Sequence, residues 1–317
     1  MKITEQVNTA AATPPKVSVV MATYNGEKFL QRQLDSIVAQ TYPNIEIIIT
    51  DDCSTDATAA LLQHYADGHS NITLVRNEKN IGYIKNFEKA IMLATADYIA
   101  LSDQDDIWHP EKISVLMKHI NGANMVYCNS ELIDNAGNSM NKNMSGLKNL
   151  GSYNDCLSFL IANGVFGHAV IMHKSIALKA MPFPADCPHD WILAFVASFC
   201  NGIVYVDELL VKYRQHADNI SGLIKTEDRK EIKKTKHDDI AWMRKRMTAL
   251  AEVALKNNCP LKEVIVKLAE CYNTFSFKNN FNRMMLFFKY RNRITAFKKR
   301  NNLRRWIFCI KMFYKLA

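Results

Sequence analysis

Short apolar runs of strand length alternate with segments of helical period along the first third of the chain. The apolar runs lie at residues 17–22, 45–50, 72–75 and 97–101. Between them, apolar residues recur every three or four positions at 27–40, 55–65 and 84–94, and Ser54 is placed to cap the second of these helices. Strands and helices that alternate through short connections favour a parallel sheet covered by helices on both faces.

The middle of the chain continues this alternation less regularly. A helix is expected from Pro110 to about residue 120, then strands at 123–128 and 165–173, a helix at 189–198, and short strands at 203–206 and 209–213. Residues 129–151 are rich in Asn, Ser, Gly and Lys, which predicts a mobile loop or a hairpin. After about residue 222 the pattern is helical to the end, with Pro260 as the strong break. The sequence therefore predicts a disordered leader at 1–15, an α/β domain at 16–222 and a helical region at 223–317.

Composition narrows the class of protein. The 317 residues are 48% hydrophobic, enough to bury a core, but no apolar run reaches the ~18 residues of a membrane span. The eight cysteines include no C-x-x-C pair, and no apolar segment with a cleavage site opens the chain. We therefore expect a reduced, cytosolic protein without a structural zinc site.

The excess positive charge is confined to the C-terminal tail. Residues 275–317 hold twelve Lys and Arg, no Asp or Glu, and eleven of the 31 aromatic residues. Apolar residues recur among these cations at helical spacing, namely Met285, Phe288, Ile294, Phe297, Ile307, Ile310 and Phe313. Such helices can bind an anionic membrane surface. The alternative is a helical cap with solvated charges, and nucleic-acid binding is the least favoured of the three.

An acidic cluster follows the strand expected at 97–101. Asp103, Asp105 and Asp106 lie within four residues, and carboxylates this close repel one another unless a cation lies between them. Mn²⁺ or Mg²⁺ would suit these oxygen ligands together with a bound phosphate. An acidic surface turn is the plainer interpretation. The end of a strand in an open α/β sheet is, however, where ligands bind.

Other candidate site residues follow neighbouring strands. Tyr24 could stack on a base, Asp52 could bind a base or ribose, and both would share a crevice with Asp105. Lys85 could pair with a diphosphate, although each of these residues taken alone is more often structural.

Two further candidates lie later in the chain. Asp190 stands at a helix start, where it could cap the helix or act as a general base. His216 could complete a metal site or contact phosphate, although a lone histidine is more often structural.

Five segments, in this order, resemble motifs of the family 2 glycosyltransferases with the GT-A fold. They are the opening strand at 17–26, Gln40-Thr41-Tyr42, the D-D-x-S-x-D pattern Asp51-Asp52-Cys53-Ser54-Thr55-Asp56, Asn80-x-Gly82 with Lys85-Asn86, and the D-x-D-D pattern Asp103-Gln104-Asp105-Asp106. The resemblance covers residues 16–222. It implies a GT-A-type mixed, mainly parallel sheet with helices on both faces and an α-helical C-terminal extension.

The resemblance also assigns roles. It implies that Ala22, Tyr24 and Asp52 bind the nucleoside, that Asp103 lies near the ribose, and that Asp105 holds the metal on the diphosphate. His189-Asp190-Trp191 resembles the acidic pair before the catalytic base, with His189 in place of the frequent first acid, so Asp190 would be the base. Tyr213-Arg214-Gln215-His216 with Asn219 and Gly222 is similar to the closing segment of rhamnosyltransferase-like and other O-antigen or capsule members.

The activity expected from this resemblance is inverting, Mn²⁺- or Mg²⁺-dependent transfer of one hexose or deoxyhexose per encounter. The Q-x-x-R-W signature of processive synthases is not found in the matching region. The donor would be a UDP- or dTDP-linked sugar and the acceptor a lipid-linked or lipopolysaccharide-type saccharide, with the enzyme peripheral on the inner face of the cytoplasmic membrane. Nucleic acid is not an expected partner.

Other classes explain less of the chain. A nucleotide-sugar-binding or nucleotidyltransferase-type protein would usually carry a glycine-rich phosphate loop, and none occurs near residues 17–26. A glycosidase with two carboxylates needs no diphosphate-metal cluster. A non-enzymatic membrane module would leave the acidic residues unexplained.

Overall fold

The computed structural model describes residues 13–216, 236–274 and 276–314. Twelve residues of the predicted leader, and the predicted motif residues Asn219 and Gly222, therefore lie outside the described residues. Pro14 and Pro15 are held against the domain, because their carbonyl oxygens accept hydrogen bonds from Asn44 and Tyr42.

The first half of the domain is the predicted parallel α/β unit. Its strands run parallel in the order β3-β2-β1-β4. Their bounds are Val17–Thr23 (β1), Ile45–Asp51 (β2), Ile72–Arg76 (β3) and Tyr98–Ser102 (β4). The connecting helices are Glu27–Val38 (α1), Thr58–Gly68 (α2) and Tyr83–Leu93 (α3). Each of these strands and helices lies where the hydrophobic pattern predicts it.

The predicted cap at Ser54 is wrong. Helix α2 begins at Thr58 after Ala57, and no side chain caps it. The Ser54 side chain and backbone N–H instead donate hydrogen bonds to Asp51 at the end of β2. A serine after an aspartate pair can thus stabilise the turn that leaves a strand rather than start a helix.

The second half makes the sheet mixed, as the resemblance implied. Its strands are Ile107–Trp108 (β5), Met125–Ile133 (β6), Ser139–Asn143 (β7), Val170–His173 (β8) and Ile203–Arg214 (β9). Strand β8 runs antiparallel to both β4 and β6, and β9 runs parallel to β6. The predicted hairpin at 129–151 is confirmed by β6 and β7.

Two stretches of predicted strand have other bounds in the structure, and the short strand β5 was not predicted. The two strands expected at 203–206 and 209–213 are one strand, β9. Its pairing with β6 changes register between Cys128 and Ser130, so the strand continues across this irregularity. Strand β8 is shorter than expected, because residues 167–169 form a 3₁₀ turn before it. Strand β5 has two residues, too few to show a period.

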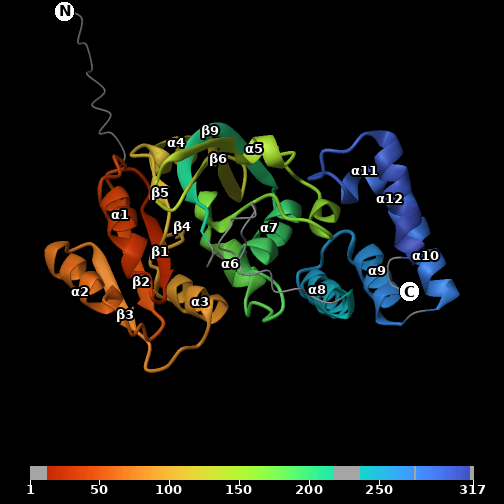
Figure 1. The fold of residues 1–317 in the computed structure, drawn as a ribbon, viewed down its shortest axis with the longest axis horizontal. Helices are drawn as coiled ribbons and strands as arrows, with labels where there is room; N and C mark the ends of the chain where they lie inside the picture. Colours follow the sequence, from red (N-terminus) through yellow and green to blue (C-terminus); the bar gives the residue numbers. More distant parts are fainter. Residues whose placement is uncertain (1–12, 217–235, 275, 315–317) are drawn as a thin grey trace, which may run out of the picture.

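Helices cover both faces of the sheet (Figure 1). Along β1, Val17, Val19 and Met21 pack on one face with α1, while Val20 packs on the other with α3. This division follows the alternation of side chains along a strand. The remaining helices of this part are Lys112–His119 (α4), Met144–Leu147 (α5), Cys156–Phe159 (the 3₁₀ helix η1), Lys174–Ala180 (α6) and His189–Phe199 (α7).

The C-terminal part is helical, as predicted, with more breaks than Pro260 alone. Its helices are Lys236–Lys256 (α8), Lys262–Asn273 (α9), Phe277–Lys289 (α10), Arg291–Ile294 (α11) and Asn302–Tyr314 (α12). They form the end of the molecule opposite α2 (Figure 1). Within the described ranges, none of the helices has both the length and the hydropathy that a membrane crossing requires. The division of the chain at residue 222 stays a prediction.

The apolar residues of the tail do not form the single face that was expected. Ile294 and Phe297 are buried in the core that also contains α7, as the alternative of a helical cap expects. Met285, Ile307 and Ile310 are exposed, at 48%, 44% and 47%. The tail therefore has an inner apolar surface that packs on the domain and an outer one that does not.

Candidate active site

The carboxyl ends of three adjacent parallel strands form one edge of the sheet. Thr23 of β1 pairs in register with Asp51 of β2, and Met21 of β1 pairs with Ser102 of β4. Tyr24, Asp52 and Asp103, the residues that follow these strands, therefore begin at the same edge. The sequence predicts a shared crevice at this edge.

Gln104 joins Tyr24 to residues 103–106, the segment between β4 and β5 that we call the acidic loop. The backbone N–H of Tyr24 donates to Gln104 Oε1 at 2.9 Å, and Gln104 Nε2 donates to the Tyr24 carbonyl at 3.1 Å. A Cβ added at Gly26 would lie 2.5 Å from Gln104 Oε1, so a glycine allows this close approach. The Tyr24 side chain remains 47% exposed and can meet a ligand.

Strands β5 and β9 fix the acidic loop from its other end. Ile107 and Trp108 pair antiparallel with Lys212 and Val211. The backbone N–H of Arg214 donates to Asp106 Oδ1 at 3.0 Å, and its buried guanidinium donates through Nε to the Asp105 carbonyl at 2.8 Å. The end of β9 thus determines where the carboxylates of the loop lie.

Asp105 and His216, the two predicted metal ligands, are in direct contact. His216 Nε2 lies 2.7 Å from Asp105 Oδ2, although 111 residues separate them in sequence. The side chains of His216 and Asp105 are 10% and 15% exposed, so both can reach a ligand from solvent. The imidazole also packs against the ring of Phe29, with centroids 5.0 Å apart.

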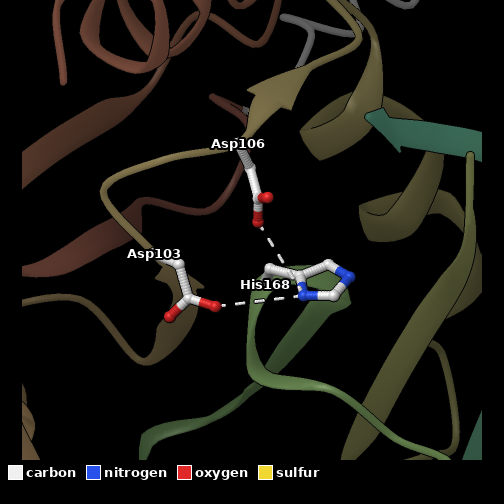
Figure 2. A group of neighbouring side chains, drawn as sticks. All are labelled: Asp103, Asp106 and His168. Carbon is white, nitrogen blue, oxygen red and sulfur yellow. Dashed lines mark ion pairs between the residues drawn. The ribbon is translucent and has the colours of Figure 1, made fainter. Parts of the chain in front are cut away.

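Asp103, Asp106 and His168 form a second group of possible metal ligands (Figure 2). His168 Nδ1 is 3.9 Å from Asp103 Oδ2 and 3.8 Å from Asp106 Oδ2, and both carboxylates point toward the imidazole in Figure 2. Asp106 Oδ2 is buried and has no hydrogen-bond partner among the described residues. His168 could not be selected from sequence, because a lone histidine ahead of a strand gives no signal that separates a ligand from a structural residue.

Burial and mutual repulsion raise the pKa values of two carboxylates in the acidic loop. Burial, followed by the charges of Asp105 and Asp190, raises the pKa of Asp103 to about 7. Burial, followed by Asp105 and Asp103, raises the pKa of Asp106 as well. A cation bound among these groups would relieve this repulsion and hold the carboxylates ionised.

A buried lysine supplies part of the compensating charge. Lys112 Nζ donates to the His168 carbonyl at 2.6 Å and lies 3.1 Å from the centroid of the Trp108 ring. Burial lowers the pKa of Lys112 to about 7. Burial, with the nearby Lys112 charge, lowers the pKa of His168 to about 3, so this imidazole is neutral at physiological pH.

Asp190 lies in the first turn of α7 without capping it. The N-cap residue is Pro188, so Asp190 is not the N-cap residue that was considered as its alternative role. Asn163 Nδ2 donates to Asp190 Oδ2 at 3.2 Å. Burial raises the pKa of Asp190 to about 6, against the opposing effect of backbone N–H groups, including those of Trp191 and Gly167.

His189 occupies an aromatic pocket beside Asp190. Its ring stacks on Phe87 with centroids 4.2 Å apart, and burial lowers its pKa to about 3. Neither ring nitrogen has a hydrogen-bond partner among the described residues. A neutral imidazole suits this pocket better than the carboxylate that frequently precedes the base in the resembling family.

Asp52 is held by the loop before α3. Its carboxylate accepts hydrogen bonds from the N–H groups of Ile81 and Gly82, each at 2.8 Å, and from Asn77 Nδ2 at 2.8 Å. Gly82 adopts φ +83°, a conformation that glycine tolerates. Asp52 therefore fixes this loop, and its role in nucleoside binding stays a prediction.

The remaining two candidates are less distinctive. Ala22 lies half-buried near the end of β1. Lys85 Nζ forms an exposed ion pair with Glu88 at 2.9 Å on α3. The structure gives Lys85 an acidic partner on its own helix, so diphosphate binding by this lysine also stays a prediction.

The family model described as "Glycosyl transferase family 2" matches residues 18–179, which include β1 to β4, the acidic loop and His168. The chain belongs to glycosyltransferase family 2. It is also 32% identical over 265 residues to the dTDP-rhamnosyl transferase RfbG of Shigella flexneri, which covers 75% of this chain and 87% of that protein. The predicted family and enzyme class are thereby confirmed.

Solved structures confirm the GT-A fold of this family 2 enzyme. The structure of Staphylococcus aureus TarS 1–349 in complex with UDP-GlcNAc has a TM-score of 0.59 and 17% identity, over 95% of this chain and 89% of that chain. The mannosyltransferase PcManGT from Pyrobaculum calidifontis, in complex with GDP-Man and Mn²⁺, has a TM-score of 0.51 and 17% identity, over 96% and 87%.

Proposed function

We propose that this glycosyltransferase moves one hexose or deoxyhexose at a time from a UDP- or dTDP-linked donor to a saccharide acceptor in the synthesis of a bacterial surface polysaccharide, O-antigen, capsule or lipopolysaccharide. The name of RfbG, a dTDP-rhamnosyl transferase, supports a deoxyhexose donor. The structures of TarS with UDP-GlcNAc and of PcManGT with GDP-Man support a nucleotide-sugar donor in general.

One observation carries the proposal: acidic groups from two distant parts of the chain meet at one edge of the sheet. A Cβ added at Gly167 would lie 3.6 Å from Asp190 Cβ on α7, and the next residue, His168, lies 3.9 Å from Asp103 Oδ2 in the acidic loop. The proposed base Asp190 and the loop that carries the proposed metal ligand Asp105 therefore lie at one site, where both would act on one donor sugar. Transfer to a hydroxyl acceptor needs both.

The donor set fits Mn²⁺ or Mg²⁺. Asp105 supplies carboxylate oxygen and His216 supplies imidazole nitrogen, and both side chains are partly exposed. Asp106 and His168 are almost fully buried, so they suit support of the loop from behind better than contact with a diphosphate. We therefore assign the metal to Asp105 and His216, where it would neutralise negative charge on the leaving nucleoside diphosphate.

Asp190 would act as the general base of an inverting displacement. With its pKa raised to about 6, it is ionised at neutral pH yet more basic than an ordinary aspartate. The hydrogen bond from Asn163 to Oδ2 orients the carboxylate. Asp190 would take the proton of the acceptor hydroxyl as that oxygen attacks the anomeric carbon.

The edge of the sheet would bind the nucleoside. The exposed ring of Tyr24 offers a stacking surface, and Ala22, Asp52 and Asp103 lie at or near the strand ends beside it. Lys85 would have to exchange Glu88 for the diphosphate. Lipid-linked or lipopolysaccharide-type acceptors would place the enzyme on the inner face of the cytoplasmic membrane, held there by its C-terminal region. No nucleic-acid partner is proposed.

Calorimetric titration of UDP and dTDP into the purified protein tests the donor site. We expect binding of at least one nucleotide that requires Mn²⁺ or Mg²⁺ and is lost in Asp105→Ala. Loss of a residue that only hydrogen-bonds a metal ligand weakens a metal site roughly tenfold or more. We expect His216→Ala, which would remove a ligand itself, to weaken metal-dependent nucleotide binding by more than roughly tenfold. His64→Ala, at an exposed position on α2, is the matched control. Undiminished metal-dependent binding in Asp105→Ala would contradict the assignment of the metal.

A further inference from the structure

Helix α10 has an apolar stripe that faces solvent. Phe277, Phe281 and Met285 recur at every fourth position and are 76%, 44% and 48% exposed. The packed side of the same helix is formed by Asn280, Arg283 and Phe287. Residues four apart lie above one another on a helix, so the three exposed side chains form one continuous stripe.

Helix α12 has apolar residues on two opposite sides. Phe308, Cys309 and Met312 are buried against the rest of the protein. The exposed apolar positions follow a second helical stripe: Leu303, Trp306, Ile307, Ile310 and Tyr314. At about 100° per residue, the centres of the two sets lie roughly opposite each other around the helix. A surface helix normally has one apolar stripe, so the second needs a separate explanation.

The two exposed stripes meet at the seam between the helices. The Phe277 ring contacts Phe313 of α12, with centroids 5.4 Å apart, and Trp306 contacts Phe288 of α10 at 5.0 Å. Figure 1 shows α10 and α12 side by side at one end of the molecule. We name the exposed residues of the two stripes, together with this seam, the α10/α12 face. A contiguous apolar surface of this kind marks an interaction site.

The charges beside the α10/α12 face are all positive. Lys278 and Lys289 lie beside the stripe on α10, and Arg304 and Lys311 lie beside the stripe on α12; all four are exposed. The sequence contains no Asp or Glu after Glu270. A second copy of the chain would oppose like charge at this face, whereas anionic lipid headgroups complement it.

We infer that the α10/α12 face binds an anionic lipid bilayer, with both helices lying in the plane of the interface. The apolar stripes would enter the boundary between headgroups and acyl chains, while the flanking cations contact lipid phosphates. This inference extends the membrane placement proposed above and names the surface responsible. It involves none of the proposed donor-site residues, so vesicle binding and nucleotide binding succeed or fail separately.

Co-sedimentation of the full chain with vesicles tests the inference. We expect binding to vesicles that contain phosphatidylglycerol and much weaker binding to phosphatidylcholine alone. A Phe281→Ser/Ile307→Ser/Ile310→Ser variant should lose binding, whereas the control Met92→Ser/Leu178→Ser, at exposed apolar positions elsewhere, should keep it. Lys278→Gln and Lys311→Gln should each lower the partition coefficient about fivefold, as expected for one basic residue near the surface.

Tryptophan quenching by brominated lipids identifies the face that inserts. Trp306 is 47% exposed on α12 and Trp242 is 38% exposed on α8. We expect Trp306→Phe to bind vesicles but lose most of the quenching, and Trp242→Phe to retain it. The reverse pattern would show that another surface inserts.

Two further outcomes would overturn the inference. One is equal binding of the wild type and the triple serine variant to anionic vesicles. The other is a wild-type dimer, seen by sedimentation velocity, that the triple serine variant abolishes in a protein that binds no vesicles. Circular dichroism of each variant confirms that its helices remain folded, and nucleotide titration confirms that its donor site is unchanged.

Discussion

Some residues of the candidate active site can be identified from sequence and others cannot. Asp105, Asp190 and His216 could be selected from sequence because each lies in a motif, and the structure brings Asp105 and His216 into contact. His168 and the buried Lys112 could not be selected. Their importance depends on partners 56 or more residues away, Lys112 with the His168 carbonyl and His168 with Asp103 and Asp106, and no local pattern reports such contacts.

The raised pKa of Asp190 predicts how folding stability depends on pH. The folded protein keeps the proton on Asp190 up to about pH 6, whereas an unfolded chain releases it near 3.8. Between these values the folded state binds more protons, so this residue's contribution to stability falls as pH rises. Asp190→Asn removes the effect, and its unfolding temperature relative to the wild type should rise from pH 4 to pH 7. A constant difference over this range would contradict the shifted pKa.

His189 predicts the cost of restoring the frequent acid. A carboxylate in the pocket that contains Phe87 would be buried without a described hydrogen-bond donor. We expect His189→Asp to lower the free energy of unfolding by about 1–3 kcal/mol or more. Urea denaturation measures this, with His64→Asp on the surface of α2 as the control. Equal losses in the two variants would show that the pocket does not disfavour a charge.

Among the elements, the long strands and helices were predictable and the short ones were not. Runs such as 17–22 and 45–50 show their burial in sequence, but two-residue β5 shows no period. The pairing of β5 with β9 nevertheless holds the acidic loop beside His216. The functional arrangement therefore depends most on an element that sequence patterns cannot detect.

Arg214 is the residue that joins these elements, and its guanidinium geometry should be essential. Through Nε and Nη1 it donates to the carbonyl oxygens of Asp105, Asp134 and Asn135. A lysine cannot reproduce this planar set of donors. We expect Arg214→Lys to lower the free energy of unfolding by about 1–3 kcal/mol and to weaken metal-dependent nucleotide binding.

Arg32→Lys provides the matched control, because Arg32 makes one exposed hydrogen bond to the Ala136 carbonyl. Denaturation and nucleotide titration should both leave that variant close to the wild type. Wild-type behaviour of Arg214→Lys would show that the acidic loop is positioned by other contacts.

For the whole molecule, the tail could be predicted to be helical and basic, but not how its apolar residues divide. Ile294 and Phe297 complete the core of the catalytic domain, while the α10/α12 face remains exposed. The helical period is the same for both sets, so only the packing of the folded chain separates them. Asp155 and Arg293 strengthen this packing with two hydrogen bonds of 2.6 and 2.7 Å.

Gly164 tests the contact between tail and domain. A Cβ at this position would overlap the Phe297 ring, at 2.3 Å from Cδ1. We expect Gly164→Ala to displace the ring and lower the free energy of unfolding by about 1–3 kcal/mol. Gly151→Ala, which has open space around it, should have a smaller effect. A Gly164→Ala protein as stable as the Gly151→Ala control would show that Phe297 does not pack against the domain as described.

The role of Asp190 as the base can be tested by the release of nucleoside diphosphate from UDP- and dTDP-sugars. Release is measured for the wild type and Asp190→Asn at saturating donor and Mn²⁺. Water can replace the unknown acceptor in this assay. We expect slow release by the wild type from at least one donor, and a loss of about 10²- to 10⁴-fold in Asp190→Asn, with nucleotide affinity unchanged. Near-normal release by Asp190→Asn would contradict the assignment of Asp190 as the base.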